Sequence, residues 1–305
     1  MQKLKVLTAY IILAAVLFSG CSSPSVPASR SVDVKSLDTS AAAATIESLD
    51  VSAPGNAKAE NDDAVIDYSN VSEGYVMVRC SKENAKAQIK GPKSTYTYSL
   101  SQDVWAAFPL SEGNGQYFVM IFENVEGTRY AMILSADFSV SLIDEFAPFL
   151  RPNQYVNFAE APESVAVAAE LTKSCETTLD KVAALYGYII SNITYDKQQA
   201  ATVKAGYLPV LDDVLERKTG ICFDYASLIT GMLRSLQIPS KLIIGYAGGM
   251  YHAWISVWID GQGWVDNLVY FDGVSWSLMD PTYASVDGNE EFIADSSNYT
   301  AKYFY

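Results

Sequence analysis

Histidine is almost absent from this chain, since His252 is the only one among 305 residues. Lysine and arginine are also scarce, with 21 of them against 35 aspartates and glutamates, and the formal net charge is −14. This charge argues against a nucleic-acid partner, because neutralising phosphates requires clustered Lys and Arg. It also argues against electrostatic docking on anionic lipid. One histidine with one nearby cysteine falls short of a zinc ligand set, so we expect neither a metal nor a cofactor.

Long apolar runs are missing beyond the N-terminus. There a basic start, MQKLK, precedes the apolar run VLTAYIILAAVLF and then SGC. This order is typical of an export signal, and the run is shorter than the roughly 20 residues of a spanning helix. The segment before Cys21 resembles a bacterial lipobox, although Phe18 stands where Leu is usual. Residues 1–20 are therefore predicted to be a signal peptide.

We expect acylation of Cys21 to anchor the protein at the extracellular face of the cell membrane. The lipid is then the only anchor, because no later stretch is apolar enough to span a bilayer. The alternative is an ordinary signal peptide that happens to carry a cysteine.

Residues 22–70 are rich in Ser, Ala and Asp and poor in aromatic side chains. They cannot bury enough apolar surface to offset the entropy lost on ordering, so we expect residues 21–70 to be a flexible, lipidated stalk. Residues 71–150 contain seven short β-rich runs separated by turn signals, which predict a small all-β sandwich domain without catalytic residues of its own. The runs are YVMVRC, AQIK, TYTYSL, VWAAFPL, QYFVMIF, RYAMIL and FSVSL.

Residues 151–305 are predicted to form a second, α+β domain. Apolar side chains at helical spacing predict a helix within residues 177–193 and a shorter one that ends at Gly220 as its C-cap. A third helix begins at Cys222 and carries one apolar stripe, made of Tyr225, Leu228, Ile229, Met232, Leu233 and Leu236. Alternating runs after Pro239 predict an antiparallel meander, and a helix followed by such a meander is an α+β layer.

Three cysteines remain once Cys21 is assigned to the lipid: Cys80, Cys175 and Cys222. In an exported chain an odd number leaves at least one of them without an intramolecular partner. Cys222 is then either a reactive nucleophile or a structural residue paired with Cys80 or Cys175. If a disulfide forms, we expect Cys80–Cys175, which would link the sandwich to the helical segment.

Cys222 has the surroundings that a nucleophilic thiol needs. It falls in the first turn of the predicted helix, where unsatisfied N–H groups and the helix dipole favour a thiolate. His252 starts a later strand, and an imidazolium beside the thiol lowers its pKa and later protonates the departing nitrogen. Asp280 precedes Pro281, so it should end a strand and place a carboxylate where it can orient the histidine.

Other aspartates need an interpretation too. Asp260, Asp266 and Asp272 are rivals for the orienting role, although turn chemistry accounts better for Asp260 and Asp272. Asp224, in the first helical turn, is expected to be structural, because carboxylates there are stabilised by the dipole.

The blocks GICFDYA, YHAW and MDPT, in this order, resemble those of the transglutaminase-like domain, whose fold is related to papain-type cysteine peptidases. NITYD at residues 192–196 also resembles the segment ahead of the cysteine block in bacterial members. Three ordered blocks with the only histidine inside one make the resemblance specific. It implies a cysteine helix packed on an antiparallel sheet, with Cys222 as nucleophile, His252 as general base and acid, and Asp280 as orienting carboxylate.

The chain departs from animal transglutaminases, whose oxyanion donor is a tryptophan upstream of the cysteine. Here no tryptophan occurs between Trp105 and Trp254. The backbone N–H of Cys222 is one candidate donor, and Tyr195 or Tyr207 is a second. Trp254 shares a strand face with His252 and is expected to line the site. No acidic loop has calcium-ligand spacing, so calcium dependence is not expected.

The sequence thus predicts a surface-anchored cysteine acyl-transfer enzyme that acts on amide bonds of cell-surface proteins or peptides through a thioester. We expect hydrolysis rather than transamidation, because transfer also needs an amine site that excludes water. The alternative is a non-catalytic binding module that retains the fold. The oligomeric state is left open.

Overall fold

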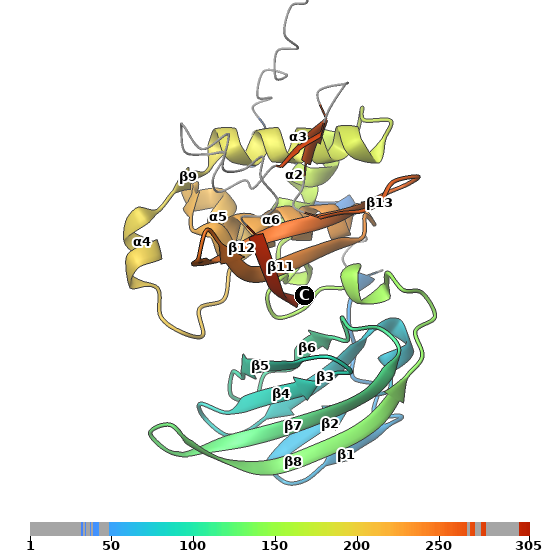
Figure 1. Ribbon diagram of the computed structural model, residues 1–305, viewed down its shortest axis with the longest axis vertical. Coiled ribbons are helices and arrows are strands. Elements are labelled where there is room, and N and C mark those ends of the chain that lie inside the picture. Colours follow the sequence, from blue (N-terminus) through green and yellow to red (C-terminus); the bar gives the residue numbers. More distant parts are fainter. Residues whose placement is uncertain are drawn as a thin grey trace, which may run out of the picture.

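The computed structural model describes residues 49–266 and 299–305, a few residues between 32 and 42, and the backbone of two strands at 269–271 and 276–278. The predicted signal peptide, Cys21 and Asp280 lie outside the described residues. The described chain forms two lobes, a β-rich lobe drawn lower in Figure 1 and a mixed helix-and-sheet lobe above it. No helix in this part of the chain has the length and apolar character needed to cross a membrane.

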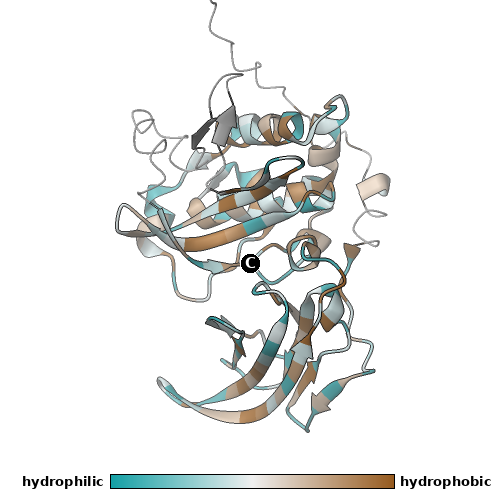
Figure 2. Cartoon of the chain, turned by 45° about the vertical axis from the view of Figure 1, so that its right-hand side comes forward, coloured by the Kyte–Doolittle hydropathy of each residue, from teal (hydrophilic) through white to brown (hydrophobic). Residues whose placement is uncertain are grey.

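The lower lobe is a sandwich of two four-stranded antiparallel sheets, with strand orders β1-β2-β3-β6 and β5-β4-β7-β8. The strands are β1 (Lys58–Glu60), β2 (Ala64–Asp67), β3 (Tyr75–Cys80), β4 (Lys86–Lys90), β5 (Thr95–Ser99), β6 (Ala106–Pro109), β7 (Gly115–Glu126) and β8 (Arg129–Val140). Side chains alternate between buried and exposed, most regularly along β5, and Figure 2 shows hydrophobic and hydrophilic residues alternating along the strands. The predicted sandwich is therefore present, with β5 at one sheet edge.

The sandwich begins earlier than the sequence predicts. β1 and β2 lie within residues 21–70, which we assigned to the flexible stalk. β1 has only one half-buried side chain, and β2 adds Ala64 and Ile66 to the core. So few apolar side chains leave no trace in a composition averaged over fifty residues. Two runs that we counted separately, RYAMIL and FSVSL, belong largely to the single strand β8.

The upper lobe places helices on a four-stranded antiparallel sheet of order β13-β12-β11-β16. Its helices are α2 (Pro162–Thr172), α3 (Thr178–Asn192), α4 (Lys197–Thr202), α5 (Leu211–Arg217) and α6 (Cys222–Ser235). Its strands are β9 (Thr194–Tyr195), β10 (Thr219–Gly220), β11 (Ser240–Ala247), β12 (Met250–Ile259), β13 (Gly263–Asp266), β14 (Val269–Phe271), β15 (Trp276–Leu278) and β16 (Tyr299–Phe304). Three short 3-10 helices, η2 (Val71–Glu73), η3 (Ala147–Phe149) and η4 (Phe158–Glu160), complete the elements.

Helix α6 is the centre of the upper lobe. It packs against β11 and β12 on one side and against α2, α3 and α5 on the other (Figure 1). Its predicted apolar stripe is buried, with Tyr225, Leu228, Ile229, Met232 and Leu233 all inaccessible to solvent. A helix enclosed in this way is a core element, so its N-terminus is held in a fixed position. The predicted α+β fold, with the cysteine helix on an antiparallel sheet, is confirmed.

Two helix boundaries show how local chemistry sets the ends. The helix predicted within residues 177–193 is α3, which begins with a capping box between Thr177 and Asp180. The helix predicted to end at Gly220 is α5, which ends earlier, with Lys218 in the left-handed region at φ 55°. The C-cap prediction for Gly220 is therefore wrong.

Aromatic side chains join the two lobes. The ring of Tyr98 from β5 lies 5.9 Å from that of Tyr305, and Tyr155 lies 4.7 Å from Tyr305. Tyr155 also meets Phe223, the residue after Cys222, edge-on at 5.2 Å. Edge-to-face pairs of this kind add about 0.5–1.5 kcal/mol beyond the burial of their area. Tyr155 thus links the sandwich, through Tyr98 at 5.6 Å between ring centroids, to the start of α6.

Candidate active site

Cys222 is the first residue of α6, and its side chain is partly exposed. Ile221 occupies the N-cap in an extended conformation and offers no side-chain hydrogen bond to the helix. The first N–H groups of an α-helix have no partner within the helix, and the dipole adds partial positive charge there. Cys222 thus lies where backbone N–H groups can stabilise negative charge that develops during a reaction.

Asp224 fixes the start of the helix from within. Its side chain is fully buried, and its carboxylate accepts hydrogen bonds from the Ile221 backbone N–H at 2.8 Å and the Tyr207 hydroxyl at 2.6 Å. Arg217 Nη2 lies 3.2 Å from its Oδ2. Burial raises the pKa of Asp224, and the partners offset part of that rise. The structural role predicted for Asp224 is confirmed.

The packing around Asp224 also requires a glycine at position 220. It pairs with Tyr195 in the short parallel ladder of β9 and β10. A Cβ at position 220 would lie 2.7 Å from the Cβ of Asp224, which is closer than side chains approach. The absence of a side chain at Gly220 lets the NITYD segment, with Tyr195, pack beside the start of α6.

Cys222 and His252 line the same cavity, which has a volume of about 590 Å³. His252 lies on β12 opposite Gly245 of β11 and is 7% exposed. Other walls come from the segment 203–208 after α4, from Gln154 and Tyr155, and from β5 of the sandwich. The structure thus brings the predicted nucleophile and the predicted base to one cavity, although 30 residues separate them in sequence.

The structure tests only some of the aspartates that could orient His252. Asp280 lies outside the described residues, as does Asp272. Asp260 accepts a hydrogen bond from the indole N–H of Trp258 at 3.1 Å, beyond the far end of β12. Eight residues of strand separate it from His252, a distance of roughly 27 Å. Asp260 is therefore excluded as the partner of His252.

The three aromatic candidates have different surroundings. Tyr195 and Tyr207 both line the cavity. The hydroxyl of Tyr207 donates to Asp224 and accepts from Arg217 at 3.1 Å, so it also holds the helix start. Trp254 is not among the described residues that line the cavity, and the expectation that it does is corrected.

Trp254 supports His252 from behind instead. Its ring is 1% exposed and lies nearly parallel to the imidazole, with ring centroids 6.2 Å apart. His252 stands near the start of β12, so a residue two positions further along lies deeper in the sheet. There the ring of Tyr299 from β16 meets the ring of Trp254, with centroids 5.2 Å apart.

Tyr251 is a candidate that the sequence does not reveal. It lines the cavity next to His252. Burial raises the pKa of Tyr251, and Tyr303, Tyr246 and the Cys222 thiol raise it further. A tyrosine hydroxyl is protonated at neutral pH in any case, so Tyr251, which is 63% exposed overall, offers a hydrogen-bond donor to the cavity.

All three described cysteines are free thiols: Cys80 is buried, and Cys175 and Cys222 are partly exposed. The Cys80–Cys175 pairing, which we considered only for the case that a disulfide forms, is absent among them, and the interpretation of Cys222 as half of a disulfide is contradicted. Cys80 lies inside the sandwich core on β3, whereas Cys175 follows α2 in the other lobe.

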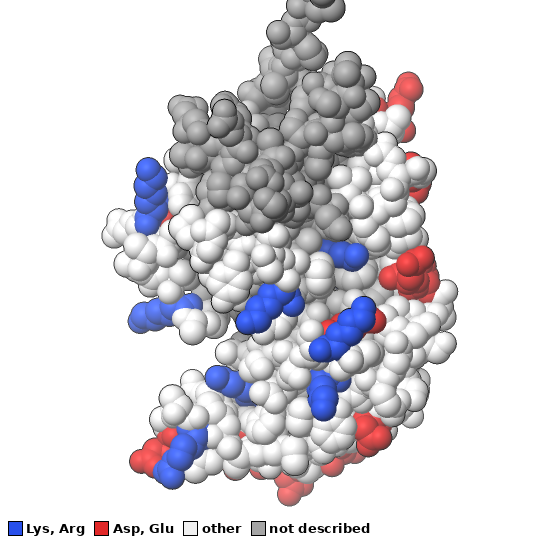
Figure 3. Space-filling model, in the orientation of Figure 1, with Lys and Arg blue, Asp and Glu red and all other residues white. Residues whose placement is uncertain are grey.

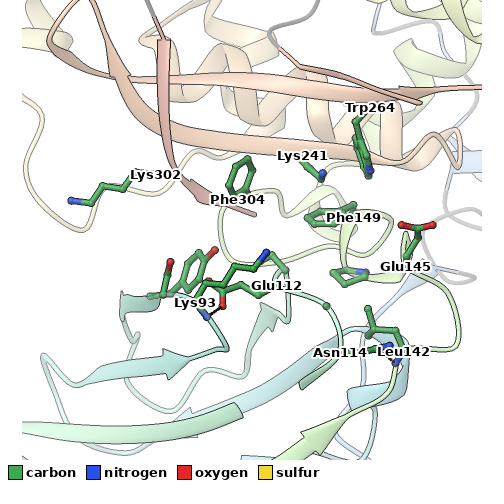
Figure 4. Close-up of a pocket in the computed structure, with 15 residues that line it drawn as sticks. Lys93, Glu112, Asn114, Leu142, Glu145, Phe149, Lys241, Trp264, Lys302 and Phe304 are labelled. Carbon is green, nitrogen blue, oxygen red and sulfur yellow. Dashed lines mark hydrogen bonds between the residues drawn. The ribbon is translucent and has the colours of Figure 1, made fainter. Parts of the chain in front are cut away.

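A second cavity, of about 410 Å³, also lies between the lobes (Figure 4). The Lys241 ammonium lies 3.5 Å from the ring centroid of Trp264 and 5.0 Å from that of Phe149. The attraction between the ammonium and the two aromatic faces stabilises the packing of these three side chains. Neither Cys222 nor His252 lines this cavity, so we assign it a structural role.

Residues 165–281 match the family model described as the transglutaminase-like superfamily, and the match contains Cys222, His252 and Asp280. The uncharacterized protein YebA of Bacillus subtilis is 31% identical over 195 residues, which are 57% of this chain and 26% of YebA. A protein-glutamine gamma-glutamyltransferase of Pseudomonas aeruginosa is 28% identical over 160 residues, 46% of this chain and 22% of that protein. This chain thus spans about a quarter of the length of these curated relatives.

Among solved structures, the periplasmic domain of TgpA from Pseudomonas aeruginosa aligns with a TM-score of 0.36 at 16% identity. The alignment covers 76% of this chain and 97% of that domain.

Proposed function

Because residues 165–281 form a transglutaminase-like domain, we propose that this chain is a cysteine acyl-transfer enzyme acting on amide bonds of proteins or peptides. The observation that carries the proposal is the cavity shared by Cys222 and His252, with Cys222 at the N-terminus of a buried helix. The similarity to a protein-glutamine gamma-glutamyltransferase supports the reaction class.

The first half of the reaction forms a thioester. His252 takes the proton of the Cys222 thiol, and Sγ attacks the carbonyl carbon of the amide. The backbone N–H of Cys222 and the hydroxyl of Tyr251 stabilise the oxyanion. When the tetrahedral intermediate collapses, the C–N bond breaks and His252 gives the proton to the departing nitrogen. Asp280 is the residue we assign to orient His252.

The second half regenerates the thiol. Water gives a proton to His252 and attacks the thioester carbon, the C–S bond of the tetrahedral intermediate breaks, and His252 returns the proton to the departing Cys222 Sγ as the carboxylic acid product leaves. We favour water over an amine as acceptor because Cys222 is partly exposed, and water therefore reaches the thioester without a dedicated site.

The site of action that we propose is the extracellular face of the cell membrane, with the chain anchored through a lipid on Cys21. The basis is the order of basic, apolar and small residues before that cysteine. The substrates would then be surface proteins or peptides.

Casein, an unfolded protein, provides a direct test. We expect the wild-type chain to release ammonia or new amino termini from casein, and to incorporate little of a fluorescent primary amine. The variant Cys222→Ala should release neither, while the matched control Cys175→Ala should retain the wild-type rate. If Cys222→Ala turns over casein at the wild-type rate, Cys222 is not the nucleophile. If neither protein turns over casein while both bind it, the chain is a binding module rather than an enzyme.

A further inference from the structure

One wall of the cavity that holds Cys222 is a sheet edge. β5 is the terminal strand of its sheet and pairs only with β4, with Thr97 opposite Gln88. Thr97 and Ser99 of β5 both line the cavity, together with Cys222. The sandwich therefore contributes to the candidate active site, although sequence patterns gave it no such role.

The hydrogen-bond ladder determines which backbone groups of β5 face outward. The N–H of Gly91 donates to the carbonyl of Ser94 at 2.9 Å, and the N–H of Leu100 donates to the carbonyl of Ala85 at 2.9 Å. Bonded and non-bonded residue pairs alternate along an antiparallel ladder. The even-numbered residues of β5 thus bond to β4. The N–H and C=O of Thr95, Thr97 and Ser99 point away from it.

These outward groups are mostly open. The carbonyl of Ser99 accepts a hydrogen bond from Gln154 Nε2 at 2.7 Å. Among the described residues, none forms a hydrogen bond with the backbone N–H or C=O of Thr97. An open N–H and C=O pair on an edge strand is a template for the backbone of an added strand. Here the template and the candidate nucleophile line the same cavity.

The charges around the cavity restrict the segment that fits. Its described lining contains no Asp or Glu, and Lys204 is its one lysine. Figure 3 shows a notch between the lobes with Lys and Arg side chains on both sides of it. The neighbouring cavity at the same junction is lined by both signs of charge, with Lys93, Lys241 and Lys302 beside Glu112 and Glu145. The cavity that holds Cys222 is thus lined by one lysine and by no described acidic side chain, which favours a neutral or acidic segment.

We infer that the substrate binds as an added strand on β5, with its backbone paired to Thr97, and that this pairing brings the reacting amide to Cys222. The inference rests on the proposed function and names its substrate class: an extended, neutral or acidic peptide segment rather than a small amide or a folded surface. Because backbone pairing does not depend on side chains, the sandwich selects unfolded segments of many sequences.

The variant Thr97→Pro tests the pairing, since proline removes the outward N–H without removing a bond to β4. Thr95→Pro is the matched control, because it removes an outward N–H of the same strand outside the cavity. Two probes are compared: casein, which can pair with an edge strand, and p-nitrophenyl acetate, which acylates a thiol without pairing. Loss of one backbone hydrogen bond should lower the casein-to-ester rate ratio by about threefold to tenfold in Thr97→Pro. The ratio should be unchanged in Thr95→Pro.

A second measurement leaves β5 intact. Amide hydrogen exchange of Thr97 in the Cys222→Ala chain should slow when casein is added. The inference is overturned if Thr97→Pro keeps the wild-type ratio, if both proline variants lower it equally, or if casein leaves the exchange of Thr97 unchanged. Failure of the proposed function looks different, because the wild-type chain would then show no ester acylation that depends on Cys222.

Discussion

The backbone N–H of Ile221 donates to Asp224 Oδ2 at 2.8 Å, directly before the residue that carries the candidate nucleophile. This bond closes the first turn of α6 around a buried carboxylate that Tyr207 and Arg217 also hold. The position of Cys222 therefore depends on residues that never contact a substrate, and this dependence can be measured.

Replacement of Asp224 by Asn should destabilise the fold. The amide cannot accept all the hydrogen bonds of the carboxylate and leaves Arg217 without its ion pair. We expect the free energy of unfolding to fall by about 1–3 kcal/mol. Urea denaturation measures this change. The control is Asp213→Asn, an exposed aspartate in the first turn of α5, and its stability should stay near that of the wild type. Equal losses in both variants would contradict the role of Asp224.

The wild type and Asp224→Asn can also be compared as a function of pH. Burial raises the pKa of Asp224 above its ordinary 3.8, so the folded state binds this proton more tightly than the unfolded state. The contribution of this group to stability is then fully present below its ordinary pKa and is lost as the pH rises through the raised value. The stability of the wild type relative to Asp224→Asn should therefore fall as the pH rises from about 4. A relative stability that rises over this range would show that the pKa is lowered.

Alanine at Gly220 should disturb the helix start. Its Cβ would lie 2.7 Å from Asp224 Cβ, and such overpacking costs about 1–3 kcal/mol. Gly187 in α3 is the matched control, because a Cβ there meets nothing within 4 Å. Alanine at 187 should be neutral or stabilising by up to about 1 kcal/mol. Thermal unfolding separates the two, and equal melting temperatures would contradict the packing argument.

Phenylalanine at Tyr251 should slow the chemistry more than it weakens binding. If the Tyr251 hydroxyl stabilises the oxyanion, its removal should lower kcat by up to about a hundredfold with little change in KM. Tyr246 lies edge-on to Tyr251 at 5.7 Å but does not line the cavity, so Tyr246→Phe is the control. Steady-state kinetics on casein measure kcat and KM for both variants. An unchanged kcat in Tyr251→Phe would show that the hydroxyl does not stabilise the oxyanion.

Serine at Cys21 should release the protein from the membrane. The expected lipid on Cys21 is the only anchor that we predict, so the variant should move from the membrane fraction to the supernatant. Cys175→Ser replaces another cysteine and should stay in the membrane fraction. If Cys21→Ser remains membrane-bound, the lipid anchor is wrong.

Much of the fold could be predicted because its periodicities are strong. The apolar stripe of α6 and the alternation of β5 each recur over several turns or residues, and both are present as expected. The weak elements were missed. β1 has three residues and a single half-buried side chain, so it forms only because β2 pairs with it.

In the candidate site too, some residues could be predicted from the sequence and others could not. Cys222 and His252 could be found because a helix start and a lone histidine are visible in sequence. Thr97 and Tyr251 could not, since their relation to Cys222 depends on how the lobes pack and how a strand ends. Trp254 was misplaced for a related reason: strand alternation gives the face of a side chain but not its depth in the sheet.

The central claim is that Cys222 is a nucleophile activated by His252. The most direct measurement is the rate of acetyl transfer from p-nitrophenyl acetate, followed by intact mass and peptide mapping. We predict one acetyl group on Cys222, with a rate lowered about 10²- to 10⁴-fold in His252→Ala. Acetylation at Cys80 or Cys175 instead, or an equal rate in His252→Ala, would contradict the claim.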